Sequence, residues 1–201
     1  ADKLSRRELF SIFRRSVDSA VRPKGPPPPL RPPGATTELK LADTCMRCGR
    51  CEAICPRQAI RPLSAEYGDA HGTPHIVARD APCVLCEGLL CSTVCPSGAL
   101  TPVRRATEVQ MGIAVIDATR CLPYRGDKCS VCLDRCPIQG ALRLDDKGRP
   151  QVHDTCTGCG ICEYYCPTER TAIKYVRGAH ESEAAQPAGN GGSSGPRRGS
   201  D

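Results

Sequence analysis

The sequence predicts an α+β fold of small repeated modules, in which short β-hairpins and short helices surround cysteine-rich loops. Four runs, beginning at Cys45, Cys83, Cys121 and Cys156, hold all 16 cysteines of the 201 residues, and each run ends in Cys-Pro. Aromatic residues make up only 3% of the chain and Trp is absent, whereas an apolar core of this size normally contains large rings. We therefore expect an inorganic group to fill much of the interior.

Short elements surround the cysteine runs. Strand-like segments precede three of them, in "HIVARDAPC", "IAVIDATRC" and "PQVHDTC". Each Cys-Pro is followed by a short passage that ends in Ala and then Ile or Leu: "CPRQAI", "CPSGAL", "CPIQGAL" and "CPTERTAI". Each repeat is thus expected to contain a strand, a cysteine loop, a short helix and a returning strand.

The cysteine spacing indicates iron–sulfur ligation. The first run, "CMRCGRCEAICP", and the fourth, "CTGCGICEYYCP", have the spacing C-x2-C-x2-C-x3-C-P, which is typical of bacterial 4Fe–4S proteins. The second and third runs have longer internal loops that still suit a cluster. Disulfides are disfavoured because cysteines three apart in a tight loop rarely pair, and zinc because its sites usually combine two separated pairs. We therefore predict tandem bacterial ferredoxin-like (4Fe–4S dicluster) modules with four 4Fe–4S clusters as cofactors.

The grouping of the ligands is a further prediction. In two-cluster ferredoxins the fourth Cys of a run ligates the cluster of the other run. Because the first and fourth runs share one spacing, we expect a nested arrangement that pairs these two and pairs the second run with the third; sequential pairing is the alternative. The nested ligand sets are Cys45, Cys48, Cys51 and Cys166; Cys83, Cys86, Cys91 and Cys136; Cys121, Cys129, Cys132 and Cys95; and Cys156, Cys159, Cys162 and Cys55.

The chain divides into three predicted parts. Residues 41–176 form the four-cluster domain, and residues 177–201 form a flexible low-complexity tail. Residues 1–40 form an arm, with an extended amphipathic helix over 5–22 and a proline-rich linker that holds it away from the body. We expect this helix to bind another subunit or a second copy of the chain, and a repeated head-to-tail contact would build a filament.

Charge and hydropathy limit the partners and the compartment. The formal net charge of +6 counts the cysteines as neutral; cluster-bound thiolates would make the central domain acidic, so nucleic acid is not an expected partner. No apolar run approaches the roughly 20 residues of a membrane helix, so no transmembrane segment is expected. The start "SRRELF" resembles a twin-arginine export signal, but the charged "SIFRRSVDSA" follows it. We therefore expect the cytoplasm, with the periplasm as the alternative.

Longer segments carry a family resemblance. The segments "GTPHIVARDAPC", "CPSGAL", "MGIAVIDATRCLPYRGDKC" and "CTGCGICE" resemble ferredoxin-type polyferredoxins of the NapG/MauM kind, which accompany periplasmic nitrate reductase and methylamine dehydrogenase systems. The seven-residue gap after Cys121 is specific to that group. The resemblance covers residues 41–176 and implies four 4Fe–4S clusters in nested pairs, held by all 16 cysteines, with electron transfer to a partner redox enzyme.

These observations predict a non-catalytic electron-transfer subunit. It would relay electrons between a tungsten- or molybdenum-pterin catalytic subunit and a flavin or ferredoxin partner, as the resemblance to subunits of tungsten aldehyde oxidoreductases implies. No catalytic residues are expected, because the four histidines are scattered without ligand spacing. Glu52, Glu87 and Glu163, inside the cysteine loops, are expected to face solvent or a partner. The alternatives are a quinol-linked carrier of the periplasmic nitrate-reductase type and an iron–sulfur assembly or maturation factor.

Overall fold

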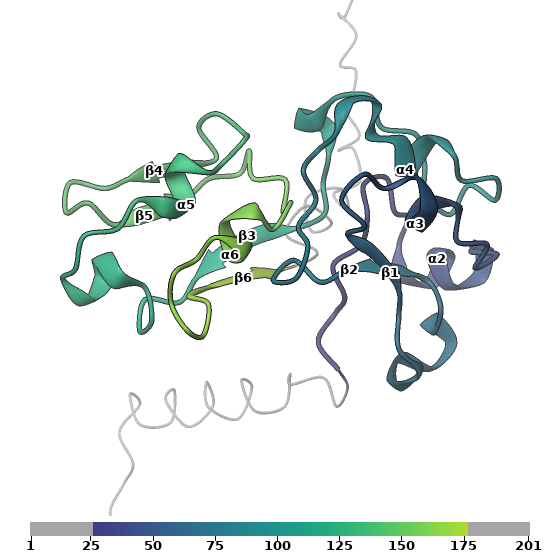
Figure 1. Cartoon of the computed structure of the whole chain (residues 1–201), viewed down its shortest axis with the longest axis horizontal. Helices are drawn as coiled ribbons and strands as arrows, with labels where there is room; N and C mark the ends of the chain where they lie inside the picture. Colours follow the sequence, from purple (N-terminus) through teal and green to yellow (C-terminus); the bar gives the residue numbers. More distant parts are fainter. Residues whose placement is uncertain (1–25, 177–201) are drawn as a thin grey trace, which may run out of the picture.

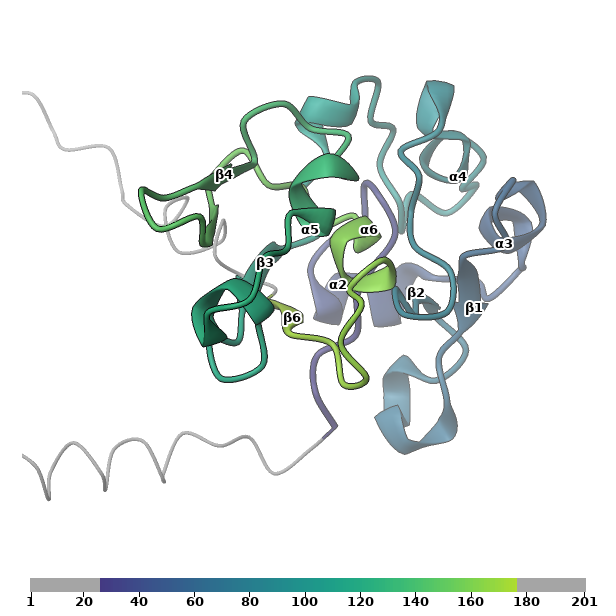
Figure 2. The ribbon, with the colours of Figure 1, turned by 60° about the vertical axis from the view of Figure 1, so that its left-hand side comes forward.

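The computed structural model describes residues 26–176 and arranges them as two modules side by side along the longest axis of the molecule (Figure 1). We call residues 26–101 module A and residues 112–176 module B; each contains two consecutive cysteine runs. The amphipathic helix predicted over 5–22 and the tail predicted over 177–201 lie outside the described residues. Figure 2, turned by 60°, shows the same two modules in contact.

Module A is built from short helices around one hairpin. Strand β1 pairs antiparallel with β2, with Ile60 opposite Ile76. The elements in chain order are α2 (Glu38–Thr44), α3 (Arg50–Ile54), β1 (Ile60–Pro62), the 3-10 helix η1 (Ala65–Ala70), β2 (Pro74–Ile76), the 3-10 helix η2 (Glu87–Leu89) and α4 (Leu90–Thr93). A 3-10 helix, η3 (Ala106–Glu108), lies in the connection to module B.

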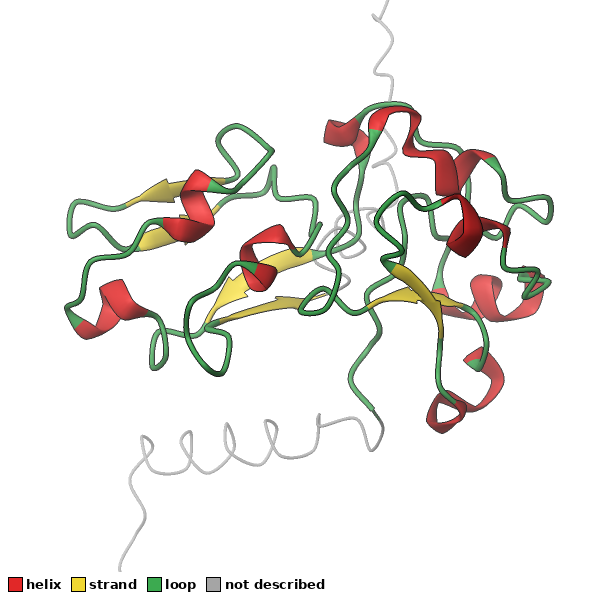
Figure 3. Ribbon diagram, in the orientation of Figure 1, coloured by secondary structure: helices red, strands yellow, loops and turns green. Residues whose placement is uncertain are grey.

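Module B contains two antiparallel strand pairs. β4 pairs with β5, and β3 pairs with β6 so that Ile113 lies opposite Val176. The elements are β3 (Ile113–Ile116), the 3-10 helix η4 (Leu122–Arg125), α5 (Val131–Asp134), β4 (Leu142–Leu144), β5 (Pro150–Val152), α6 (Ile161–Tyr164) and β6 (Ile173–Val176). The sheets of the two modules are therefore all small, as Figure 3 shows.

Both modules follow one plan. A central hairpin, β1–β2 or β4–β5, joins the two cysteine runs of the module. The segment before the first run then pairs with the segment after the second run: Ala35 bridges Leu100 in module A, and β3 pairs with β6 in module B. The predicted fold of short hairpins and short helices is confirmed, and the structural repeat contains two cysteine runs.

The proline-rich segment belongs to module A. Leu30 and Arg31 are each only 1% exposed, and the Leu30 carbonyl accepts a 2.8 Å hydrogen bond from the Ile76 amide. The expectation that this segment is a spacer up to residue 40 is therefore wrong from Leu30 onward. The reason is that its buried side chains complete a core that the sparse apolar residues of the cysteine loops cannot complete alone.

Arg31 fastens this segment to two other elements. Its Nη1 donates to Thr73 Oγ1 at 2.9 Å and to the Pro74 carbonyl at 2.8 Å, next to β2. Its Nη2 donates to the Glu38 carboxylate in α2 at 2.6 Å. Burial lowers the pKa of Arg31 to about 10, far enough above neutrality for the guanidinium to remain charged. A single buried cation thus holds α2, the proline-rich segment and β2 together.

The main core continues from one module into the other. Its buried residues are Leu30, Ala59, Ile60, Ile76, Ala78, Leu89 and Cys91 from module A, Val109 and Met111 from the connection, and Cys159 and Ile161 from module B. The modules therefore form one packed body. None of the helices in residues 26–176 has the length and apolar character needed to cross a bilayer.

Candidate metal centres

The 16 cysteines, all within the described residues, line four hollows with four cysteines each. In every hollow three cysteines come from one run, and the fourth, which precedes Pro, comes from the other run of the same module. The sets are Cys45, Cys48, Cys51 and Cys95 at site 1; Cys55, Cys83, Cys86 and Cys91 at site 2; Cys121, Cys129, Cys132 and Cys166 at site 3; and Cys136, Cys156, Cys159 and Cys162 at site 4.

The nested grouping predicted from the sequence is therefore wrong. Cys95 joins Cys45 at site 1, and Cys166 joins Cys121 at site 3. The physical reason is the central hairpin: each hairpin folds the second run of a module back onto the first, so neighbouring runs exchange their fourth cysteines. Equal spacing within two runs carries no information on which runs are neighbours in space. The alternative of sequential pairing describes the observed sets.

The hollows suit a polynuclear group. In residues 26–176, no group of three or more His, Cys, Asp or Glu side chains is arranged to hold a single metal ion. Each hollow is partly open to solvent and has four cysteines in its lining. Four thiols around such a space match a cube with one thiolate at each corner.

The loops wrap around the hollows through left-handed turns. The residue before the second Cys has φ of 55° at Arg47, 49° at Leu85 and 70° at Gly158. A left-handed conformation is uncommon for residues other than glycine, and such strain is concentrated at functional loops. Gly49 and Gly160 follow the second Cys of their runs, with φ of 71° and 83°, and begin α3 and α6. These turns let three cysteines of a run face one hollow.

Backbone amides donate to the sulfurs of three of the four cysteines that end the runs. Three such hydrogen bonds, each 3.4 Å long, run from Ala59 N to Cys55 Sγ, from Leu100 N to Cys95 Sγ and from Ala172 N to Cys166 Sγ. Burial raises the pKa of Cys95 and of Cys166, but the hydrogen bonds outweigh it and lower both pKa values overall. In iron–sulfur proteins, hydrogen bonds to sulfur help to set the reduction potential.

Four thiols, one or two at each of sites 1, 2 and 3, have raised pKa values. Burial raises the pKa of Cys51 and Cys132 to about 11 and that of Cys83 and Cys91 to about 12, and other thiols of the same site add to the shift. Only thiolates ligate metal, so these cysteines become ligands when a cationic group displaces their protons. The donor set therefore fits a resident iron–sulfur core.

The acidic residues of the loops differ in their surroundings. Glu52 and Glu87 are exposed, as expected. Glu163, expected to face solvent or a partner, is half-buried, and its Oε2 is buried with no hydrogen-bond partner in the described residues, so the structure contradicts the first of these alternatives. Burial raises the pKa of Glu163, and the charge of Arg79 opposes that shift. Glu163 is in the lining of site 4.

Sequence reasoning missed two arginines as anchors. Arg47 donates to the carbonyl oxygens of Cys45, Asp69 and His71 at 2.8–3.1 Å and so fixes the first cysteine loop against η1. Arg79 connects the two modules through three carbonyl oxygens. An arginine in a polar loop looks like an ordinary exposed charge in the sequence, and only the position of the acceptors reveals its role.

A known family covers the first module. Residues 44–99 match the family described as a 4Fe-4S dicluster domain. That match spans the cysteine runs beginning at Cys45 and Cys83 and contains all eight cysteines of sites 1 and 2. It agrees with module A as a unit and identifies 4Fe–4S clusters as the cofactor type.

Whole-chain relatives extend the likeness to both modules. The chain is 42% identical over 161 residues to the ferredoxin-type protein NapG of Escherichia coli K12, covering 73% of this chain and 70% of the relative. It is 38% identical over 198 residues to the methylamine utilization ferredoxin-type protein MauM of Methylobacillus flagellatus, covering 87% and 85%, and 41% identical over 160 residues to MauM of Methylorubrum extorquens, covering 73% and 72%. With the cysteine geometry above, these relatives show that the chain belongs to the NapG/MauM family of ferredoxin-type iron–sulfur electron-transfer proteins.

Proposed function

We propose that this chain is an electron-transfer subunit carrying four 4Fe–4S clusters, one at each cysteine site. The observation that supports it most is the division of 16 cysteines into four sets of four, each completed by the fourth cysteine of the neighbouring run. This exchange is the ligation pattern of two-cluster ferredoxins. A 4Fe–4S cluster supplies reversible one-electron chemistry, and the chain positions the clusters and adjusts their potentials.

Site 1 is the proposed point of exchange with one partner. Cys48 lies there, and it is the one exposed cysteine among the 16, all of which are described. Met46, also in the lining of site 1, is 66% exposed, and Leu39 in α2 is 76% exposed. Exposed apolar side chains next to an accessible ligand suit contact with a second redox protein. Electron transfer becomes faster as the separation decreases, so docking at this face would favour exchange.

The identity of the partners is the finer part of the proposal. We propose that the series of four clusters receives or delivers electrons at one end through a tungsten- or molybdenum-pterin catalytic subunit and at the other end through a flavin or ferredoxin protein. The NapG and MauM relatives fit the alternative of a quinol-linked carrier of the periplasmic nitrate-reductase type. Self-association through the predicted helix over 5–22 and a cytoplasmic location remain predictions; cell fractionation and the size of the purified assembly test them.

An anaerobic redox titration followed by EPR tests the function. We expect each cluster to accept one electron reversibly and the reduced chain to pass its electrons to a redox protein that copurifies with it. An assembly factor would instead deliver iron and sulfide to an apo-protein and lose its own clusters during the reaction. Reversible reduction with unchanged iron content supports the carrier, whereas cluster loss to an apo-acceptor without electron transfer contradicts it.

A further inference from the structure

We infer that electrons cross between the modules from site 2 to site 4, so that the path runs through site 1, site 2, site 4 and site 3. This order differs from the order of the cysteine runs in the chain. The inference rests on the proposed function and adds which clusters are internal and which are terminal. It also assigns a role to the residues that hold the modules together, none of which is a cluster ligand.

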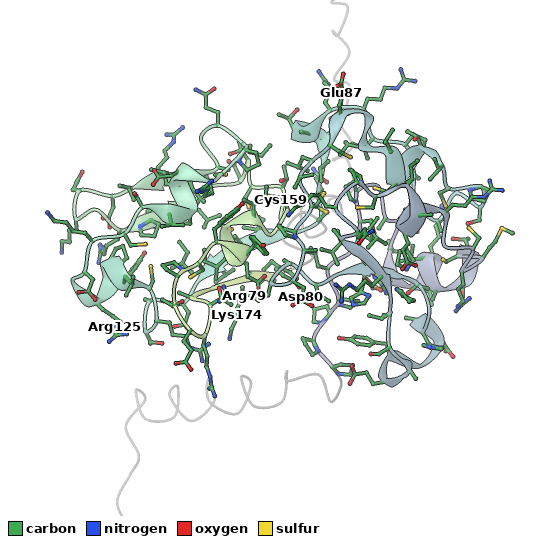
Figure 4. All side chains as sticks on the ribbon, viewed as in Figure 1. Arg79, Asp80, Glu87, Arg125, Cys159 and Lys174 are labelled. Atoms are coloured by element: carbon green, nitrogen blue, oxygen red, sulfur yellow. The ribbon has the colours of Figure 1, made fainter. Side chains whose placement is uncertain are left out.

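The contact between sites 2 and 4 is direct. The backbone amide of Cys83, a site 2 cysteine, donates a 3.0 Å hydrogen bond to the carbonyl of Cys159, a site 4 cysteine. The side chains are also close, because Cys91 of site 2 and Cys159 of site 4 belong to one buried core cluster, against which Cys83 packs. Figure 4 shows Cys159 in the middle of the molecule, where the two modules meet.

Contacts within each module fix the rest of the order. In module A, helix α3 carries Cys51 of site 1 and is followed directly by Cys55 of site 2. In module B, α5 carries Cys132 of site 3, which belongs to the same buried cluster as Cys162 of site 4. Sites 1 and 3 are therefore the outer members of the path. Arg125, in the 3-10 helix whose first residues line site 3, lies at the end of module B far from Cys159 (Figure 4).

A glycine allows the modules to approach closely. A Cβ on Gly160, in module B, would lie 2.3 Å from the Cβ of Ala78, in module A. Gly158 serves a contact within module B instead, because a Cβ there would lie 2.6 Å from the carbonyl oxygen of Gly112. The close approach of the modules therefore requires glycine at position 160.

Arg79 closes the same junction from module A. Its Nη1 donates to the carbonyls of Glu163 at 2.9 Å and Cys166 at 3.0 Å, and its Nη2 donates to that of Thr168 at 3.3 Å. Only one residue separates Arg79 from the Ala81–Cys83 segment that leads into site 2. The guanidinium therefore holds the segment that leads into site 2 against the C-terminal end of α6 and the residues after it. Helix α6 carries Cys162, a ligand of site 4.

Gly160→Ala tests the inference, with Gly148→Ala as its control. Gly148 lies in the turn between β4 and β5, outside all four sites; its φ of 72° is similar to that of Gly160, but its added Cβ would meet nothing within 4 Å. Both substitutions carry the same backbone strain, and only Gly160→Ala separates the modules. In holo-protein we expect both variants to keep the wild-type iron content. In the EPR spectrum of the reduced protein, we expect Gly160→Ala to lose the broadening that comes from spin–spin interaction between the clusters of sites 2 and 4. After flash reduction, we expect electrons to move between the modules more slowly in this variant than in the wild type.

Ala78→Leu provides a second variant outside the cysteine runs. Ala78 is 1% exposed and faces Gly160, so its enlargement separates the modules without altering a cysteine loop. Loss of inter-module broadening in this variant, with Gly148→Ala unchanged, supports the order. Wild-type spectra and kinetics in an iron-replete Gly160→Ala or Ala78→Leu protein would overturn it. A wild-type protein without clusters would instead overturn the proposed function, so the two failures are distinguishable.

Discussion

Arg31 shows how much one side chain contributes to a chain with so few large apolar residues. It is 1% exposed and bonds Thr73, Pro74 and Glu38. Arg31→Met preserves most of the volume but leaves a buried carbonyl and hydroxyl without their donor. We expect a loss of about 2–4 kcal/mol in the free energy of unfolding of the holo-protein, the usual cost of breaking such a buried pair. Anaerobic urea unfolding, followed by cluster absorbance, measures it.

Arg61→Met is the matched control for that substitution. Arg61 and Asp80 form an ion pair at 3.7 Å in which both side chains are more than half exposed. An exposed pair of this kind contributes about 0–1 kcal/mol. Equal urea midpoints for the two variants would contradict the importance of the buried contacts of Arg31.

The lowered pKa of His75 predicts that the stability of the folded protein depends on pH. Burial lowers the pKa of His75 below its ordinary 6.5, and the charges of Arg31 and Arg61 add to the effect, whereas a hydrogen bond to the Arg61 carbonyl opposes it. The unfolded chain therefore takes up this proton at higher pH than the folded chain. The contribution of His75 to stability falls as pH drops through 6.5 and stops falling below the folded pKa.

We therefore expect the thermal midpoint of the holo-protein to decrease between about pH 7.5 and about pH 5.5, and to decrease less in His75→Gln. His71→Gln, at an exposed position, serves as the control and should follow the wild type. Differential scanning calorimetry under argon compares the three proteins. Parallel pH profiles for wild type and His75→Gln would show that His75 does not contribute.

At the residue scale the sequence was informative about cysteines and uninformative about arginines. A run such as Cys45–Pro56 defines its chemistry through spacing, because three ligands of a cluster must be close in the chain. Arg31 and Arg79 have no such signal, since their acceptors are carbonyl oxygens on other elements. Such contacts depend on the folded path of the chain and not on local composition.

At the scale of elements, the hairpins decide which cysteines share a cluster. The sequence predicted strands before three of the runs, and β2, β3 and β5 confirm them. It could not predict their partners, because strands of three or four residues carry too little pattern to specify pairing. The incorrect nested pairing of the cysteine runs follows from this lack of information about strand partners. In the structure, the pairings β1–β2 and β4–β5 bring neighbouring runs together.

Single-cysteine variants test the observed pairing. Cys95→Ser is expected to weaken site 1, so that alkylation of the native protein followed by mass spectrometry labels Cys45, Cys48 and Cys51. The nested arrangement would expose Cys121, Cys129 and Cys132 instead. Cys166→Ser is the matched control because it removes the equivalent ligand of module B and should expose that second set. Labelling in the opposite pattern would contradict the cysteine sets described above.

At the scale of the whole molecule, metal and not apolar packing is expected to stabilise the fold. The sheets of residues 26–176 are two-stranded, and an isolated hairpin is marginally stable in water. Aromatic residues make up only 3% of the chain, so apolar side chains alone provide a small core. The free energy of cluster binding is then also free energy of folding, and removal of iron by a chelator should unfold both modules.

Four 4Fe–4S clusters are proposed to fill the four cysteine sites. The decisive measurement is the quantification of iron and acid-labile sulfide in the anaerobically purified chain. By the composition of a 4Fe–4S cluster, we predict about 16 irons and about 16 sulfides per chain, with EPR signals of reduced 4Fe–4S clusters. A preparation that is folded yet contains far less iron, or contains zinc in its place, would show that the four sites do not hold 4Fe–4S clusters.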